Sequence, residues 1–417
     1  MSYFVLHAHC YMQEGSEKSA VYDIFQSRIF WIEEEWKQKF LQYSRKGCSM
    51  EEAAAKTGVA AETAAQYSRF LQQLDLGLIF STKRASAKFK PFNTKFQAKK
   101  NGFFRPLAMV TLETSSKCAK NCEGCAALKS MECACGIYSD TSGVTYDIDN
   151  AIRLLCYTGI QLIMIAGGEP YDNRQDLEKI IASAHSRGIP VMVKTPFLRI
   201  TETDIKYLKD HGAFLSLTLH DLTDSDDCDT HELSRFQDIL SICAKAGYTN
   251  VNVTLCLRSK YVRHLQDTLN LINSIHVKVN SVSVEYAADI CSLGAEEIQK
   301  AVSQAFPFSH VRYAADMEKV TRNLTGHPCW ADGLCIMASG EVKPCIASGD
   351  LSFGNLHNKH LLEIIHDRPD SIILDNGKMC EPCSGCEFSL GCFSCSVANG
   401  KVTGNRNGKA WDCTYNL

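Results

Sequence analysis

Three closely spaced cysteines give this sequence its first chemical signal. They read Cys118-Ala-Lys-Asn-Cys122-Glu-Gly-Cys125, so three thiols share one short loop. Three thiolates can hold three irons of a 4Fe–4S cube and leave the fourth iron open, much as a catalytic metal keeps one open position. A structural zinc loop is the alternative, because Cys133 or Cys135 could complete a set of four ligands. The spacing predicts a metal centre and favours the open cluster over zinc.

A second motif, Gly167-Gly168-Glu169-Pro170, follows an apolar run further along the chain. Glycine lets the backbone approach a ligand closely, and a carboxylate beside it could bind an ammonium group. Alone, these four residues would be an ordinary turn. Placed one strand and one helix after the three-cysteine loop, they predict a second part of the same site.

The C-terminal part of the chain holds nine of the 21 cysteines. In order, they read Cys329-x5-Cys335, Gly340-x4-Cys345, Cys380-x2-Cys383-x2-Cys386-x5-Cys392-x2-Cys395 and finally Cys413. Nine thiols are one more than two four-cysteine sites require, and a pair of zinc knuckles is the alternative to iron–sulfur clusters. With no export signal in the sequence, we expect a reducing cytoplasm, where clustered thiols more often bind metal than form disulfides.

Six apolar runs within residues 107–318 must position these motifs. The runs are Ala108–Leu112, Gln161–Ala166, Val191–Lys194, Phe214–Leu219, Val251–Leu257 and Val282–Tyr286. Helical segments between them end at Gly159, Gly188, Gly212 and Gly247, and glycine suits the left-handed residue that ends a helix. Repeated strand–helix units predict an α/β fold with parallel strands in an open or closed barrel. The carboxyl ends of such strands carry the chemistry.

Residues 1–82 predict a separate α+β unit with a winged-helix shape. We expect strands over Tyr3–Met12, Ser27–Ile32 and Leu76–Phe80, and helices over Ser49–Thr57 and Ala61–Leu74. Ser49 and Glu52 form a capping box at the start of the first of these helices. Residues 83–106 carry eight Lys and Arg and no Asp or Glu, which indicates a solvated linker. Residues 319–417 predict a third unit that metal holds together.

Composition excludes several classes of function. A chain of 417 residues with 45% hydrophobic residues can form more than one globular domain. Its net charge of −3 gives no general attraction to nucleic acid or anionic lipid, and no apolar run is long enough to span a bilayer. Residues 1–82 hold eight Lys and Arg against ten Asp and Glu, a poor footprint for binding phosphate. We expect neither a nucleic-acid nor a membrane partner.

The two barrel motifs together resemble the radical S-adenosylmethionine (radical SAM) superfamily. Its signature is C-x3-C-x2-C followed by a GGEP-like motif, and the resemblance covers about residues 107–310. It implies a partial (β/α)6 barrel in which the three cysteines ligate a 4Fe–4S cluster and S-adenosylmethionine chelates the open iron. The Gly167–Pro170 motif would contact the methionyl end of that cofactor. Cleavage of the cofactor would produce a 5′-deoxyadenosyl radical that removes a hydrogen atom from the substrate.

Two positions depart from the family pattern. Gly124 stands where the family usually has an aromatic residue, just before the third cysteine. In the fourth strand, Ser216-Leu-Thr218 replaces a serine–aspartate pattern, and Thr218 could stand in for the serine near the ribose. Lys194, at the end of the third strand, is a candidate for the cofactor carboxylate. A lysine that extends to solvent at the rim is an equal alternative.

The C-terminal cysteines resemble the SPASM domain of radical enzymes. Its consensus includes a cysteine, a G-x4-C, a C-x2-C-x5-C-x3-C and a final cysteine, and here the last interval is two residues instead of three. By that resemblance, one auxiliary cluster is bound by Cys329, Cys335, Cys345 and Cys395. The other is bound by Cys383, Cys386, Cys392 and Cys413. Cys380 is left over and could exchange with a neighbour.

Fused to such an enzyme, the N-terminal unit resembles the PqqD-like peptide-recognition element of ribosomal-peptide (RiPP) maturases. Those elements capture a leader peptide as an extra strand on a sheet edge. Tyr3–Met12 or its neighbour would be that edge. A packing appendage without a ligand is the alternative.

The resemblance therefore implies a maturase that modifies a ribosomally made precursor peptide, with an external reductant such as flavodoxin or ferredoxin. A thioether crosslink is the product we expect first, and a carbon–carbon crosslink second. Epimerisation would need a thiol hydrogen donor such as Cys228, Cys256 or Cys291, although each also suits the role of a buried hydrophobe. Two further interpretations are a sulfatase-type maturase, which oxidises a cysteine or serine in a protein, and a zinc-stabilised winged-helix regulator without enzyme activity.

Overall fold

The fold is taken from a computed structural model of the chain. The structure describes residues 1–85, 107–115, 118, 141, 143–220, 230–274, 279–286, 292–305, 317–327, 329–373, 383–392, 395–406, 408–410 and 413. Most of the expected linker over 83–106 lies outside the described residues. Within them, no helix is both long enough and apolar enough to cross a membrane.

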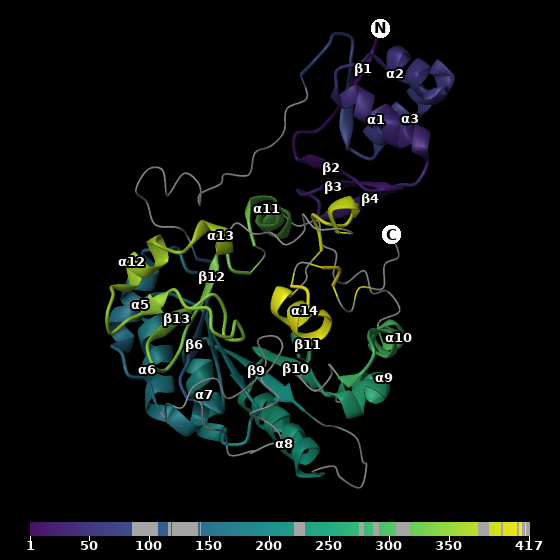
Figure 1. The fold of residues 1–417 in the computed structure, drawn as a ribbon. Coiled ribbons are helices and arrows are strands. Elements are labelled where there is room, and N and C mark those ends of the chain that lie inside the picture. Colours follow the sequence, from purple (N-terminus) through teal and green to yellow (C-terminus); the bar gives the residue numbers. More distant parts are fainter. Residues whose placement is uncertain are drawn as a thin grey trace.

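A central sheet runs through the middle of the molecule in the order β11-β10-β9-β8-β7-β6-β12-β13-β14 (Figure 1). Its first six strands in sequence are β6 (Met109–Glu113), β7 (Leu162–Ala166), β8 (Val191–Thr195), β9 (Phe214–Leu219), β10 (Val251–Leu257) and β11 (Ser281–Tyr286). All six pair in parallel, each with its neighbour in sequence. The six predicted apolar runs are therefore the six strands of a partial (β/α)6 barrel.

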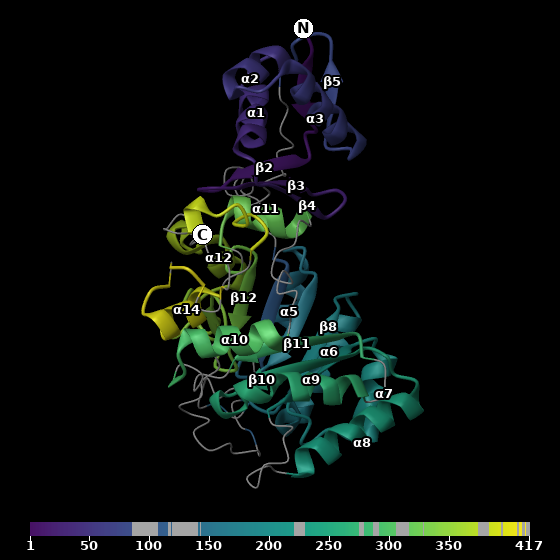
Figure 2. The same ribbon diagram turned by 90° about the vertical axis from the view of Figure 1, so that its right-hand side faces the viewer.

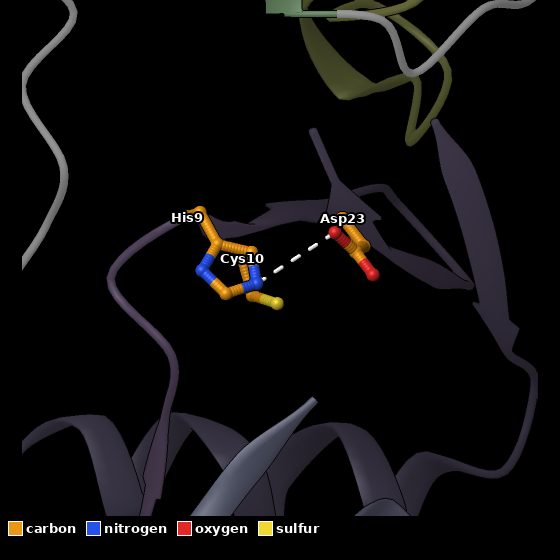
Figure 3. A group of neighbouring side chains, drawn as sticks. All are labelled: His9, Cys10 and Asp23. Carbon is orange, nitrogen blue, oxygen red and sulfur yellow. Dashed lines mark ion pairs between the residues drawn. The ribbon is translucent and has the colours of Figure 1, made fainter. Parts of the chain in front are cut away.

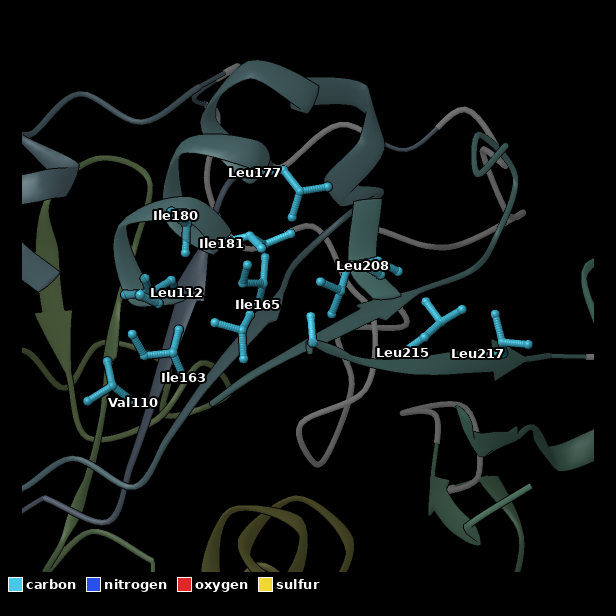
Figure 4. Packing of buried hydrophobic residues seen from close by; sticks show 14 of the residues in the cluster. Val110, Leu112, Ile163, Ile165, Leu177, Ile180, Ile181, Leu208, Leu215 and Leu217 are labelled. Atoms are coloured by element: carbon cyan, nitrogen blue, oxygen red, sulfur yellow. The ribbon is translucent and has the colours of Figure 1, made fainter. Parts of the chain in front are cut away.

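Helices cover the outer face of this sheet. They are α5 (Ile148–Cys156), α6 (Arg174–His185), α7 (Glu202–Asp210), α8 (Thr230–Ala246), α9 (Leu265–Ser274) and α10 (Ala295–Ala305). Figure 4 shows Leu177, Ile180 and Ile181 of α6 packed against Ile163 and Ile165 of β7. Burying each such side chain contributes about 2 kcal/mol, so this interface stabilises the barrel.

The glycines predicted to end four barrel helices do so. Gly159, Gly188, Gly212 and Gly247 have φ angles of 69°, 68°, 61° and 61°, in the left-handed region that side chains with a Cβ disfavour. Each glycine turns the chain back toward the next strand, and this explains why an apolar run follows shortly after every one of them.

The N-terminal unit is α+β, with five strands and three helices. The strands are β1 (Tyr3–Leu6), β2 (Cys10–Glu14), β3 (Ser19–Asp23), β4 (Arg28–Ile32) and β5 (Gly77–Phe80), and the helices are α1 (Glu35–Arg45), α2 (Met50–Thr57) and α3 (Ala61–Gln73). The strand expected over Tyr3–Met12 was wrong as a single element. The chain turns where the Cys10 amide donates to the His7 carbonyl, so β1 pairs with β5 while β2 joins a separate sheet, β2-β3-β4. The predicted capping box is confirmed, because Ser49 and Glu52 exchange both hydrogen bonds.

The C-terminal region is more regular than the sequence suggested. Its elements are α11 (Met317–Thr325), β12 (Gly333–Ile336), β13 (Glu341–Lys343), β14 (Gly354–Asn355), α12 (Leu361–His366), α13 (Asp370–Ile373) and α14 (Ser396–Thr403). Strand β12 pairs in parallel with β6, so the cysteine-rich region extends the barrel sheet itself. The sheet β2-β3-β4 lies against α11, at the end of the molecule away from α8 (Figure 2).

Candidate active site

The two faces of the barrel sheet differ in chemistry. Residues paired across parallel strands point to the same face, and here Lys194 lies opposite Ser216, while Thr218 lies opposite Thr254. The residues between them, such as Leu217, point the other way into the apolar core. Strands of a parallel sheet that packs apolar groups on both faces are apolar almost throughout. The polar alternation therefore marks the inner face as the surface that meets a polar ligand.

A chain of hydroxyl groups crosses this inner face. The Ser216 Oγ lies 2.9 Å from the Thr254 Oγ1, which lies 3.2 Å from the Ser283 Oγ on β11. Thr218, one step closer to the carboxyl end of β9, is fully buried, and its Oγ1 has no hydrogen-bond partner among the described residues. A buried hydroxyl without a partner is costly, so Thr218 fits a polar ligand in that place.

An ion pair spans the inner face between strands that are not neighbours. The Lys194 Nζ on β8 contacts the Glu285 Oε1 on β11, across β9 and β10. Their side chains are 4% and 16% exposed. The alternative of a lysine extended to solvent is therefore wrong, because Lys194 is held inside by a carboxylate that sequence reasoning missed. The second oxygen of Glu285, Oε2, is buried with no hydrogen-bond partner in the described part of the chain.

Polar residues at every second position were the signal that could have found Thr254, Ser283 and Glu285. The run Val251–Leu257 reads Val-Asn-Val-Thr-Leu-Cys-Leu, and β11 reads Ser-Val-Ser-Val-Glu-Tyr. Such alternation in a parallel strand predicts one face that is not packed in the core.

The Gly167–Pro170 motif touches the segment that leads into the three-cysteine loop. The Gly168 amide donates to the Ser115 carbonyl at 2.9 Å. Gly167 has φ = 130°, and a Cβ on it would lie 2.8 Å from the same carbonyl oxygen. Only glycine combines a positive φ angle with the absence of a Cβ atom. Gly167 is therefore required for the close approach of these two loops.

Glu169 links the carboxyl ends of two neighbouring barrel strands, β7 and β8. It is fully buried, and its carboxylate accepts hydrogen bonds from the Thr195 Oγ1 at 2.7 Å and from the amides of Tyr171 at 3.2 Å and Leu198 at 3.1 Å. Burial raises the pKa of Glu169, while those three hydrogen bonds act in the opposite direction. The carboxylate thus joins the ends of β7 and β8.

The three-cysteine loop begins beside this motif. Cys118 is half-buried, three residues after Ser115. Cys122 and Cys125 lie outside the described residues, as do the zinc alternatives Cys133 and Cys135.

The structure brings four C-terminal cysteines together. Cys329, Cys345 and Cys395 pack against a small cluster that contains Cys335, which is fully buried on β12. Cys335 pairs with Thr111 of β6. Its side chain therefore points to the same inner face of the sheet as Lys194. These are the four thiols assigned by resemblance to one auxiliary cluster, and their donor set suits a 4Fe–4S group.

Buried polar groups brace this thiol group against the barrel. The Arg368 side chain is 1% exposed and donates to the carbonyls of Trp330 at 3.4 Å and of Gly333, the first residue of β12, at 3.2 Å. The Glu113 carboxylate at the end of β6 accepts from the Ala338 amide at 3.0 Å. These hydrogen bonds fix the thiol group relative to the strands of the barrel.

A second group of cysteines lies on the segment 383–392. Burial, together with the charges of Glu387, Cys392 and Cys383, raises the pKa of Cys386 to about 12. Cys383, Cys386 and Cys392 follow one another within ten residues, a spacing that fits a cluster site. Cys413 is half-buried near the end of the chain, and Cys380 lies outside the described residues.

A further set of possible metal ligands, His9, Cys10 and Asp23, lies in the N-terminal unit (Figure 3). Asp23 already accepts hydrogen bonds from the amides of Phe25 at 3.1 Å and Gln26 at 3.0 Å and from Arg28 at 2.8 Å. Burial, with nearby Asp23 and Asp75, raises the pKa of Cys10 to about 12. We therefore assign Asp23 to the turn between β3 and β4, and Cys10 to the core.

Comparison with known proteins agrees with this architecture. Residues 112–272 match the radical SAM superfamily, and residues 329–387 match the SPASM iron–sulfur cluster-binding domain. The structure of histidine-tagged anSMEcpe with bound AdoMet is similar with a TM-score of 0.55 and 16% identity, over 73% of this chain and 90% of that one. Streptococcus suis SuiB bound to the precursor peptide SuiA aligns over 98% of both chains, with a TM-score of 0.46 and 13% identity. No curated protein matches the sequence.

A partial barrel with a glycine-rich rim, extended by a thiol-rich region, fits the two domains that these family models describe. The chain is a radical SAM enzyme with a SPASM domain, and its cofactors are S-adenosylmethionine and 4Fe–4S clusters.

Proposed function

We propose that this enzyme modifies a ribosomally made precursor peptide and forms a thioether link from a peptide cysteine to a carbon atom. The observation that carries the proposal is the position of Cys335, on a strand of the barrel sheet itself. An auxiliary cluster bound there would lie beside the polar inner face, where it could accept an electron or hold a substrate thiolate. Structures of anSMEcpe that contain AdoMet and the Cp18Cys peptide support a peptide substrate for this fold.

We assign cofactor roles to residues of the barrel. The three cysteines of the 118–125 loop would hold the catalytic cluster, which with S-adenosylmethionine supplies the radical that removes hydrogen. The Gly167–Gly168 backbone would contact the methionyl end, and Glu169 would hold that loop in place. Thr218, with its buried hydroxyl, would bind the ribose, while Ser216 would support it through the hydroxyl chain. Lys194 would share its charge between Glu285 and the cofactor carboxylate.

The N-terminal unit is proposed to bind the leader peptide. Within the described residues, β2 and β4 each pair only with β3, so both are edges that can accept an extra strand. The unit's net charge of −2 argues against nucleic acid as the partner. We place the enzyme in the cytoplasm, where a protein such as flavodoxin or ferredoxin would supply electrons.

The test is coexpression with candidate peptides, followed by mass spectrometry and anaerobic purification. We expect about 12 irons per chain, a loss of two hydrogens per crosslink, and a cysteine and a second residue joined in fragment spectra. Two hydrogens lost from a single cysteine or serine would replace the proposal with sulfatase-type oxidation. A colourless protein with stoichiometric zinc would replace it with a regulator.

Variants of two cysteines make that test specific. Cys118→Ala should abolish formation of 5′-deoxyadenosine, because one of three iron ligands is lost. Cys156→Ala is the matched control, since this exposed cysteine of α5 belongs to neither the loop nor the thiol groups. Residual cofactor cleavage in Cys118→Ala would refute the ligand assignment.

A further inference from the structure

The N-terminal unit is joined to the segment that carries Cys383, Cys386 and Cys392. The Tyr22 hydroxyl on β3 donates to the Glu387 carbonyl at 2.6 Å. The Ser16 amide donates to the Gly385 carbonyl at 2.9 Å. These bonds connect residues more than 360 positions apart in sequence, so they are purely tertiary.

Side chains of the N-terminal sheet and of segment 383–392 also pack against each other. The ring of Trp31 on β4 meets Phe388 edge-on, with centroids 5.0 Å apart and planes at 67°. Phe388 and Glu387 are each only 2% exposed. An edge-on aromatic pair of this kind stabilises a contact beyond the effect of burial. The face of the N-terminal sheet therefore covers the segment instead of merely approaching it.

Tyr22 lies at the centre of this interface. It is fully buried, in an apolar cluster with Ala20, Ile24 and Val320, against which Leu390 also packs. Its hydroxyl bonds to the carbonyl of Glu387, the residue directly after Cys386.

Gly15 shows how closely the two parts fit. A Cβ on Gly15 would lie 2.7 Å from the Lys18 carbonyl oxygen, 2.8 Å from the Glu387 Oε2 and 3.1 Å from the Glu387 amide. Such distances exclude any larger residue without movement of the backbone. The turn between β2 and β3 is thus shaped to receive the cysteine segment.

We propose that the β2-β3-β4 sheet forms one wall of the second auxiliary cluster site, with Tyr22 and Trp31 as positioning residues. Tyr22 fixes the carbonyl of the residue after Cys386, and Trp31 keeps water from the segment beside it. Hydrogen bonding and solvent exposure around a cluster control its stability and potential. The proposal rests on the assignment of Cys383, Cys386 and Cys392 to a cluster and is independent of the peptide substrate.

The experiment measures iron release to a chelator from anaerobically purified full-length holoenzyme, with the cluster signals followed by electron paramagnetic resonance. Cys386→Ala first identifies which set of about four irons belongs to this segment. In Tyr22→Phe, we expect that set to be released about fivefold faster, the factor that corresponds to one ordinary hydrogen bond. Trp31→Ala should act in the same direction. The other irons, about eight, should leave at the wild-type rate.

Tyr67→Phe is the matched control. Tyr67 is also a buried tyrosine of the N-terminal unit, but it packs against Trp36 and Phe40 in the helical half. Wild-type release rates in both Tyr22→Phe and Trp31→Ala would overturn the proposal, as would equal acceleration of all irons or the same acceleration in Tyr67→Phe. If Cys386→Ala retained all irons, the assignment of Cys386 to a cluster would be wrong. The proposal that the β2-β3-β4 sheet forms a wall of that cluster site would then be wrong too. Trp31 is 48% exposed, so that variant is expected to fold even where Tyr22→Phe does not.

Discussion

The two groups of C-terminal thiols are held in different ways. The group around Cys335 is built into the barrel, because β12 continues the catalytic sheet and Arg368 braces the adjoining loop. The group on segment 383–392 contacts the N-terminal sheet through Tyr22 and Trp31, and it contacts α11 through Asn323, which donates to the carbonyls of Leu390 and Cys392. One thiol group is thus held by strands of the barrel sheet, and the other lies between α11 and the domain proposed to bind the leader peptide.

This difference changes what removal of the N-terminal unit should do. Deleting residues 1–82 should abolish leader-peptide binding but leave cofactor cleavage, now uncoupled from substrate. Because the deletion also uncovers segment 383–392, we expect about four of about 12 irons to be lost. Peptide affinity, 5′-deoxyadenosine and iron content together measure the effect. If the truncated enzyme keeps every iron, neither thiol group depends on the N-terminal unit. If its affinity for the peptide is unchanged, the N-terminal unit does not bind the leader peptide.

The ion pairs of the barrel and of the N-terminal unit should differ in how much each contributes to stability. Lys194→Met leaves the carboxylate of Glu285, which is only 16% exposed, without its partner, and this should lower the free energy of unfolding by about 3 kcal/mol. Replacing both residues, in Lys194→Met with Glu285→Leu, should recover much of the loss. Lys39→Met is the control, because the Lys39–Glu35 pair on α1 is exposed and should contribute little. Chemical denaturation measures all three, and equal effects at both lysines would contradict a buried inner-face pair.

The smallest effect is expected at the capping box of the N-terminal unit. Ser49→Ala removes the hydrogen bond to the Glu52 amide and should destabilise α2 by about 1 kcal/mol. Iron content should not change, since the cysteine segment contacts the β2-β3-β4 sheet and not this helix in the described structure. Thermal unfolding followed with iron analysis tests both statements. Iron loss in Ser49→Ala would mean that the whole unit, and not one sheet, supports the cluster site.

Sequence patterns located the barrel because its signals are local. Four of the six apolar runs are preceded by a helix that ends in glycine, and both features can be read within about 30 residues of chain. Helix α1 was missed because its first residue is preceded by Glu34, which makes no side-chain capping bond. Strand β3 was missed because it is short and buried along its whole length between β2 and β4, so it lacks the alternation of a half-exposed strand.

The sequence by itself determined the chemistry of this protein: the cysteine spacings, the glycine-rich rim and the parallel strands that carry them. These depend on residue type and short separations, which the chain displays directly. Only the tertiary structure decided which groups meet. The pairing of Lys194 with Glu285, the place of Cys335 on the barrel sheet and the contact of Tyr22 with Glu387 join residues 91, more than 200 and 365 positions apart. Such contacts are set by how strands and domains pack, and no local pattern records them.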